Sequence, residues 1–155
     1  MNEVTILLVE DSYADQRLTR EALTESDRGT QLQVVKDGCE AIDYIWRRGK
    51  YAFLPHPDLI ILDLNLPKKS GHEVLAEMRE NPFLRNIPVV IFTSSMSPGE
   101  KAEMQKLNAN FYIIKPDSLE KFFAVIKAIE DFTIKYAENP QYLQELSETL
   151  RQSAA

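Results

Sequence analysis

Residues 59–75 read LIILDLNLPKKSGHEVL, and this stretch contains a complete strand–turn–helix pattern. Four consecutive apolar residues of strand length end at Asp63. The segment LNLPKKSG has turn composition, and Gly71, Val74 and Leu75 then begin an amphipathic stripe with helical spacing. A short strand that is apolar throughout is typical of a parallel strand covered on both faces. The stretch therefore predicts one β–α unit of a layered α/β fold.

The same alternation extends in both directions along the chain. Strand-like apolar runs occur at residues 4–9, 32–35, 88–93 and 111–114, and helix-period segments follow them. The first helix is predicted over 13–25, where Ser12 and Asp15 have the form of a capping box. Five β–α units with right-handed crossovers predict one doubly wound parallel sheet. Asn139-Pro140 then indicates the start of a short extra C-terminal helix with Leu143, Leu146 and Leu150 on one side.

The composition excludes several classes of function. A chain of 155 residues with net charge −6 is long enough for one sizeable core, and its charge disfavours binding to nucleic acid or to an anionic membrane. A single cysteine excludes an internal disulfide, and two histidines make an all-protein zinc site implausible. Neither a signal peptide nor an apolar run of roughly 20 residues occurs, so we expect a cytoplasmic protein.

Polar residues stand where the predicted strands end. They are Glu10, Asp11, Asp63, Thr93 and Lys115. Ligand sites of doubly wound sheets lie at the carboxyl ends of the strands, so these side chains should converge at one edge. Each residue alone also has a structural explanation, as a helix-start acid, a turn residue, a strand threonine or a surface lysine. The functional interpretation rests on all five occurring together.

The chemistry of this set indicates phosphoryl transfer. Three adjacent carboxylates repel one another unless a cation lies between them, and oxygen ligands alone favour Mg²⁺. A hydroxyl from Thr93 and an ammonium from Lys115 supply what a transferred phosphoryl group needs. One carboxylate would then be the nucleophile that forms an aspartyl phosphate. Asp63 is favoured because it stands alone before an open turn.

The motifs LLVEDS, LIILDLNLPKKSGHEVL, IPVVIFTSS and NANFYIIKP make residues 4–132 similar to the receiver domain of two-component response regulators. The resemblance implies a flavodoxin-like fold with strand order 2-1-3-4-5, a receiver over 1–137, and a helical extension over 138–155 without an output domain. The long segment RRGKYAFLPHP and this short C-terminal helix resemble the stand-alone regulators that pair with cyanobacterial phytochrome histidine kinases.

The resemblance also implies a role for each site residue. Asp63 would accept the phosphoryl group and, with Asp11 and the backbone carbonyl of Asn65, bind Mg²⁺, while Glu10 acts through water. Thr93 would hydrogen-bond the phosphoryl group, Lys115 would pair with it, and Tyr112 would be the switch aromatic. In the family the bond here joining Lys115 and Pro116 is usually cis, which helps to aim the lysine.

Three functions are compatible with parts of this pattern. The leading one is a signalling protein, not an enzyme, that takes a phosphoryl group from a sensor histidine kinase. A haloacid-dehalogenase-type phosphatase uses a similar set but needs a second acid where this chain has Asn65. An adaptor with a vestigial site is disfavoured because all five site residues are present. The chain has no phosphate-binding GxxxxGK[ST] loop and no GxGxxG turn for a nucleotide.

The predicted helix over 119–136 has an apolar band wider than one core contact requires. Val125, Ile129, Phe132 and Tyr136 extend the band beyond the side that faces the sheet. We therefore expect a homodimer that uses this surface. The alternative is that the C-terminal helix folds back and covers the band within one chain.

Overall fold

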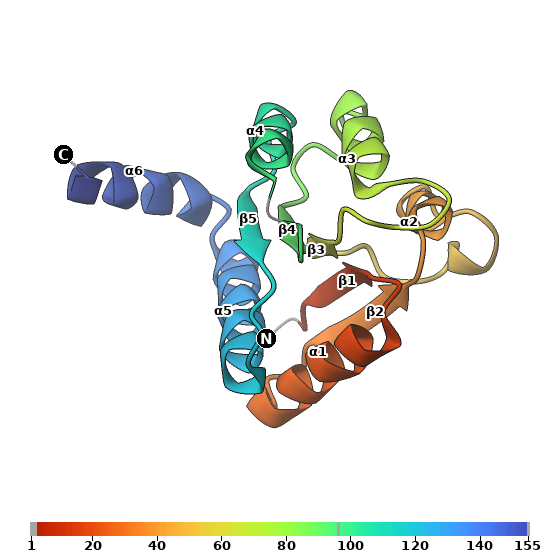
Figure 1. Ribbon diagram of the computed structural model, residues 1–155, viewed down its shortest axis with the longest axis horizontal. Helices are drawn as coiled ribbons and strands as arrows, with labels where there is room; N and C mark the ends of the chain where they lie inside the picture. The colour runs from red at the N-terminus through yellow and green to blue at the C-terminus, as the bar shows by residue number, and fades with distance from the viewer. Residues whose placement is uncertain (1–2, 96, 155) are drawn as a thin grey trace.

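The computed structural model describes residues 3–95 and 97–154 and shows a five-stranded parallel sheet with helices on both faces (Figure 1). The strand order is β2-β1-β3-β4-β5, which confirms the predicted doubly wound fold. The strands are β1 (Thr5–Val9), β2 (Gln31–Val35), β3 (Leu59–Leu62), β4 (Val89–Thr93) and β5 (Phe111–Ile114).

The helices are α1 (Tyr13–Ser26), α2 (Gly38–Ile45), α3 (Gly71–Glu80), α4 (Pro98–Lys106), α5 (Leu119–Glu138) and α6 (Tyr142–Ala154). A short 3-10 turn, Gly49–Tyr51, lies in the long segment after α2. The predicted ranges differ from the observed ones by one or two residues at their ends, which is the usual uncertainty of a helix or strand boundary.

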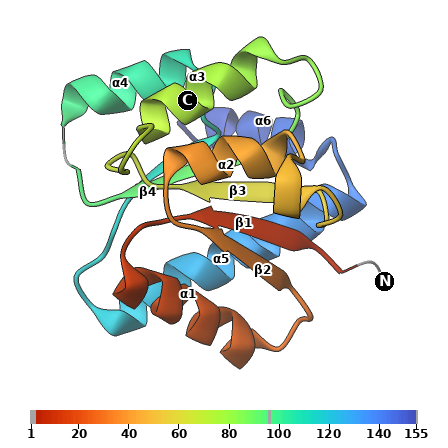
Figure 2. The ribbon, with the colours of Figure 1, turned by 90° about the vertical axis from the view of Figure 1, so that its right-hand side faces the viewer.

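The two faces of the sheet bury alternate residues of each central strand. In β3, Ile60 and Leu62 pack in the cluster under α2 and α3, whereas Leu59 and Ile61 pack in the cluster under α1 and α5. Figure 2 shows α1 and α5 on one side of the strands and α2, α3 and α4 on the other. Both faces of β1, β3 and β4 are thus covered, which explains why β3 is apolar throughout and why β1 and β4 are apolar except for one threonine each.

Each helix that covers the sheet starts next to the carboxyl end of a strand. At all five starts a side chain accepts a hydrogen bond from the backbone N–H three residues later, which satisfies a donor that the helix itself leaves free. The capping residues are Ser12, Asp37, Ser70, Ser97 and Ser118. These caps fix the helix starts around the edge where the polar residues gather.

Gly71 brings the start of α3 against the backbone that carries Asp63. A Cβ atom at this position would lie 2.3 Å from the Asp63 carbonyl oxygen and 2.8 Å from Leu64 Cα. Such distances are too short for any side chain, so glycine is required for the helix to approach this closely. The contact holds the end of β3 in place.

Helix α6 leaves the body of the molecule after Asn139 and extends away from it (Figure 1). Its first half nevertheless covers part of the apolar band on α5, because Tyr142, Leu143 and Leu146 pack against the cluster under α1 and α5. The Tyr142 ring lies 5.8 Å from that of Phe132, measured between centroids. The side chain of Leu150 is outside the described residues.

The predicted dimer surface is therefore partly covered within the chain. Ile129 and Phe132 are buried, whereas Val125 and Tyr136 are half-buried. Beside them an apolar pocket of about 320 Å³ remains open between β5, α5 and α6. The folding-back alternative is thus realised for part of the band only. Among the described residues, no helix has the length and apolar character needed to cross a membrane.

Candidate functional site

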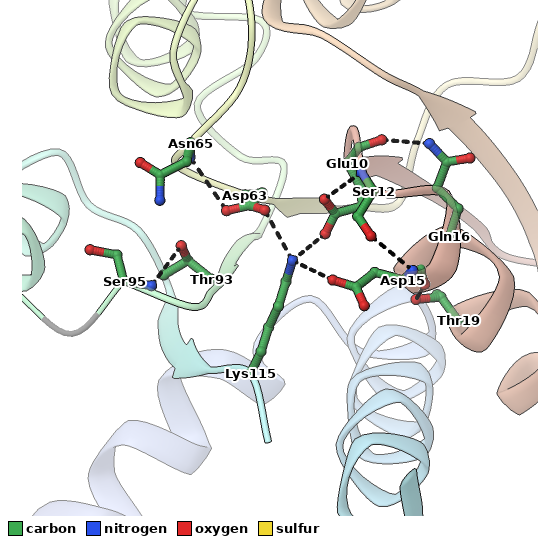
Figure 3. Close-up of polar contacts among 10 residues, drawn as sticks. All are labelled: Glu10, Ser12, Asp15, Gln16, Thr19, Asp63, Asn65, Thr93, Ser95 and Lys115. Atoms are coloured by element: carbon green, nitrogen blue, oxygen red, sulfur yellow. Dashed lines mark hydrogen bonds and ion pairs between the residues drawn. The ribbon is translucent and has the colours of Figure 1, made fainter. Parts of the chain in front are cut away.

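Four strands deliver the predicted site residues to one edge of the sheet, and Figure 3 shows Glu10, Asp63, Thr93 and Lys115 there. Glu10 and Asp11 follow β1, Asp63 follows β3, Thr93 ends β4 and Lys115 follows β5. The backbone N–H groups of Glu10, Asp63 and Lys115 still bond to neighbouring strands, so the sheet itself positions these residues. The structure brings all five together, as their places in the sequence predict.

Three carboxylates form an acidic cluster, which we define as Glu10, Asp11 and Asp63. One oxygen from each lies within 4.8 Å of the others. Glu10 and Asp63 are buried, whereas Asp11 is exposed and leaves the cluster accessible from solvent. Oxygen donors of this number and charge fit a hard divalent cation such as Mg²⁺. The backbone N–H of Asn65 donates to Asp63 Oδ1 at 3.4 Å, beside this cluster.

Lys115 lies against the acidic cluster and also reaches Asp15. Its Nζ atom is 2.5 Å from Glu10 Oε1, 2.7 Å from Asp15 Oδ2 and 3.0 Å from Asp63 Oδ2. Burial alone would lower the pKa of the ammonium, but the hydrogen bonds that it donates to Asp15 and Glu10 raise this pKa above its usual value. The side chain, only 9% exposed, therefore remains a cation at neutral pH.

The carboxyl group of Glu10 has a raised pKa. Burial raises the pKa of its carboxyl to about 7, although the hydrogen bond from Lys115 acts in the opposite direction. The charge of Asp63 also raises the pKa of Glu10. The backbone N–H of Ser12 donates to Glu10 Oε2 at 3.1 Å and fixes the other oxygen. A divalent cation at the acidic cluster would favour the ionised form of Glu10.

Thr93 and Tyr112 are joined through Ser95. The fully buried Thr93 accepts a hydrogen bond from the Ser95 N–H at Oγ1, over 3.3 Å. The Tyr112 hydroxyl donates to the Ser95 carbonyl over 3.2 Å, and the Ser95 hydroxyl donates to Glu100 of α4 over 2.7 Å. Contacts thus run from the site hydroxyl to β5 and α4.

The bond between Lys115 and Pro116 is trans, so the expected cis bond is wrong for this structure. The trans form is intrinsically preferred at proline by about 0.5–1 kcal/mol. The three carboxylates around Nζ hold the Lys115 ammonium in the site without the cis bond.

Asp15 also belongs to the site, although the sequence pattern predicts only a role for it in the cap of α1. Its backbone N–H does bond to Ser12 Oγ, at 3.3 Å, as the capping box predicts. Its carboxylate, however, points to Lys115 (Figure 3). The available signal was its place in the first turn of the helix that follows Asp11, because that turn lies at the same edge of the sheet.

Comparisons with known proteins agree with this geometry. Residues 6–127 match the model of the response regulator receiver domain. Over 135 residues the chain is 42% identical to response regulator Rcp1 of Synechocystis sp. (strain ATCC 27184 / PCC 6803 / Kazusa), covering 87% of this chain and 92% of Rcp1.

Two solved structures share both fold and sequence with the chain. The phosphorylated cyanobacterial phytochrome response regulator RcpA superposes with a TM-score of 0.82 at 44% identity, over 86% of this chain and 95% of RcpA. The Mn²⁺-bound form of Rcp1 gives a TM-score of 0.79 at 43% identity, over 83% and 93% of the two chains.

Proposed function

This chain belongs to the response regulator receiver family and is related to the phytochrome response regulators; from this we propose that it accepts a phosphoryl group on Asp63 from a sensor histidine kinase. One observation carries the proposal: the Asp63 carboxylate belongs to the acidic cluster and also lies 3.0 Å from the Lys115 ammonium. This is the arrangement that a carboxylate nucleophile needs to receive a dianionic group.

In the proposed reaction, an Asp63 oxygen attacks the phosphorus of a phosphohistidine. The new P–O bond forms as the P–N bond breaks, and the imidazole leaves with its electron pair. Mg²⁺, held by Asp11, Asp63 and the Asn65 carbonyl and through water by Glu10, would neutralise charge on the transferred group. Lys115 would pair with one phosphoryl oxygen, and the Thr93 hydroxyl would donate to another.

We assign the kinase to the phytochrome class because the relative RcpA supports it. RcpA is a phytochrome response regulator, and the chain resembles it over most of both lengths. The support for a divalent cation is similar: Rcp1 binds Mn²⁺, and the donor atoms of the acidic cluster suit Mg²⁺ equally. We propose that the phosphoryl transfer takes place in the cytoplasm. We also propose that the receiver comprises residues 1–137 and the helical extension residues 138–155.

We also propose that the protein forms a homodimer on the side of β5 and α5. β5 is an edge strand whose first three residues are half-buried and whose last residue, Ile114, is 38% exposed. The open apolar pocket beside Val125 and Ala128 continues this surface. A second copy related by a two-fold axis would cover both. Ile129 and Phe132 would support this interface from within the chain.

Labelling with a small phosphodonor tests the phosphorylation proposal. We expect wild type, incubated with acetyl phosphate and Mg²⁺, to gain one base-labile phosphate visible by intact mass. Asp63→Asn should gain none. Asp43→Asn, which removes an exposed carboxylate paired with Arg48, should label like wild type. Label on Asp63→Asn, or an unlabelled wild type, would refute the proposal. Rapid phosphate release without accumulation would instead indicate a phosphatase.

A further inference from the structure

Lys115 has one partner that does not belong to the acidic cluster. Its three N–H groups are directed at three carboxylates: Glu10 and Asp63 from the cluster, and Asp15 from the first turn of α1 (Figure 3). An ammonium has three donors and no more, so its hydrogen-bonding capacity is fully used.

These three bonds are not equivalent once the site is filled. A divalent cation at the acidic cluster draws on the oxygens of Glu10 and Asp63, and so it competes with Lys115 for them. The cation also repels the ammonium. Asp15 is outside the cluster, and its bond to Lys115 at 2.7 Å is not subject to that competition.

Asp15 is itself held firmly. Its backbone N–H bonds to the Ser12 hydroxyl at 3.3 Å, and its carbonyl accepts from the Thr19 hydroxyl at 2.8 Å. Its side chain is 26% exposed, so the carboxylate stands at the rim of the site and not beneath it. A charged acceptor on the first turn of a capped helix is well placed to keep a flexible lysine oriented.

Resting on the phosphorylation of Asp63 proposed above, we propose that Asp15 is a positioning residue for Lys115. It holds the ammonium in place while Glu10 and Asp63 turn to the cation, and it thereby leaves two N–H donors directed at the phosphoryl group. Asp15 does not touch the phosphoryl group in this scheme.

The first test is the affinity of the magnesium-loaded protein for beryllofluoride, which mimics the phosphoryl group. We expect Asp15→Ala to weaken this affinity on the order of tenfold, because a hydrogen bond between two charged groups is lost. Asp15→Asn keeps a hydrogen-bond acceptor without the charge, so its affinity for beryllofluoride should fall by a smaller factor. Glu21→Ala, which removes an exposed carboxylate from the same helix, is the matched control and should bind as wild type does.

The second test reads the lysine directly and needs no phosphorylation. In protein with ¹⁵N-labelled lysine side chains and Mg²⁺, the Lys115 ammonium signal is assigned by its absence from Lys115→Arg. Its hydrogen exchange with water should be slow in wild type and clearly faster in Asp15→Ala. Thermal unfolding of each variant checks that the fold is retained, and Asp15→Asn serves if Asp15→Ala does not fold.

Unchanged ammonium exchange together with unchanged beryllofluoride affinity in the Asp15 variants would overturn the assignment. Tighter beryllofluoride binding by Asp15→Ala would also overturn it, since Asp15 would then be a competitor for Lys115. If wild type accepts no phosphate, the function proposed above fails, but the exchange of the Lys115 ammonium still decides the role of Asp15.

Discussion

The Tyr112 hydroxyl donates a hydrogen bond to the backbone carbonyl of Ser95, 3.2 Å away. The N–H of the same Ser95 bonds to the Thr93 hydroxyl, so one residue connects the site hydroxyl to Tyr112 of β5. If Thr93 turns toward a phosphoryl group, Ser95 loses a partner and the Tyr112 contact is weakened.

We expect phosphorylation, or beryllofluoride with Mg²⁺, to change hydrogen exchange in residues 94–112. Helix α4 lies in this range and has one buried side chain, Met104, so few apolar contacts resist its movement. Tyr112→Phe should raise exchange in the same range without phosphorylation. Peptides from α2 serve as the internal control. Unaltered exchange over 94–112 on activation would show that the signal leaves the site by another route.

Asp11→Asn should weaken Mg²⁺ binding at least roughly tenfold, because a hard divalent cation loses its exposed anionic ligand. Calorimetric titration of Mg²⁺ into wild type and variant measures the difference. Asp43→Asn removes a surface carboxylate of equal charge and should bind Mg²⁺ as wild type does. Equal affinity in Asp11→Asn would leave Asp11 as no more than an acid at the start of α1.

The pKa of Glu10 predicts a pH effect on the stability of the cation-free protein. Burial raises this pKa from 4.5 to about 7, so between these values the folded chain binds the proton more tightly than the unfolded chain does. The stability that Glu10 contributes is fully present below pH 4.5 and is lost as the pH rises through about 7.

Glu10→Gln cannot ionise and should remove this dependence. In the presence of a metal chelator, the free energy of unfolding of Glu10→Gln should exceed that of wild type at pH near 8. The difference between the two should shrink toward pH 4.5. Urea unfolding across this range measures it. A wild type that gains stability relative to Glu10→Gln as the pH rises would contradict the raised pKa.

Sedimentation tests the homodimer. A wild-type monomer at micromolar concentration would refute it. Phe132→Glu is a poor probe, since Phe132 is 9% exposed and packs on Phe111, so the variant buries a charge. Ala128→Glu, at the exposed rim of the pocket, should dissociate the dimer while keeping the fold. Ala137→Glu is the matched control, because nine helical positions place it on the opposite side of α5.

The sheet and most of the site could be predicted because they depend on local pattern. Continuous apolar runs such as 59–62 identify buried parallel strands, and parallel strands place their carboxyl ends at one edge. The convergence of Asp63 and Lys115 follows from that rule without any knowledge of side-chain contacts. The start of α1 followed from the capping residue Ser12.

The features that could not be predicted are side-chain and backbone orientations, because tertiary contacts determine them. The capping-box pattern that includes Asp15 is equally compatible with a carboxylate that points into solvent. Asp15 gains a partner only because the fold places Lys115 beside it. The burial of Phe132 depends on where α6 leaves α5, which the apolar stripe does not specify. The isomer of the bond before Pro116 likewise depends on surrounding packing.

The contact between Lys115 and Glu10 joins residues that are 105 positions apart. Lys115 follows the last strand and Glu10 the first, so the site is complete only after the whole sheet has formed in register. A chain with β5 unpaired or shifted by one residue would have the acids but not the ammonium. Under the proposed function, a kinase could therefore phosphorylate only fully folded molecules, and incompletely folded chains would transmit no signal.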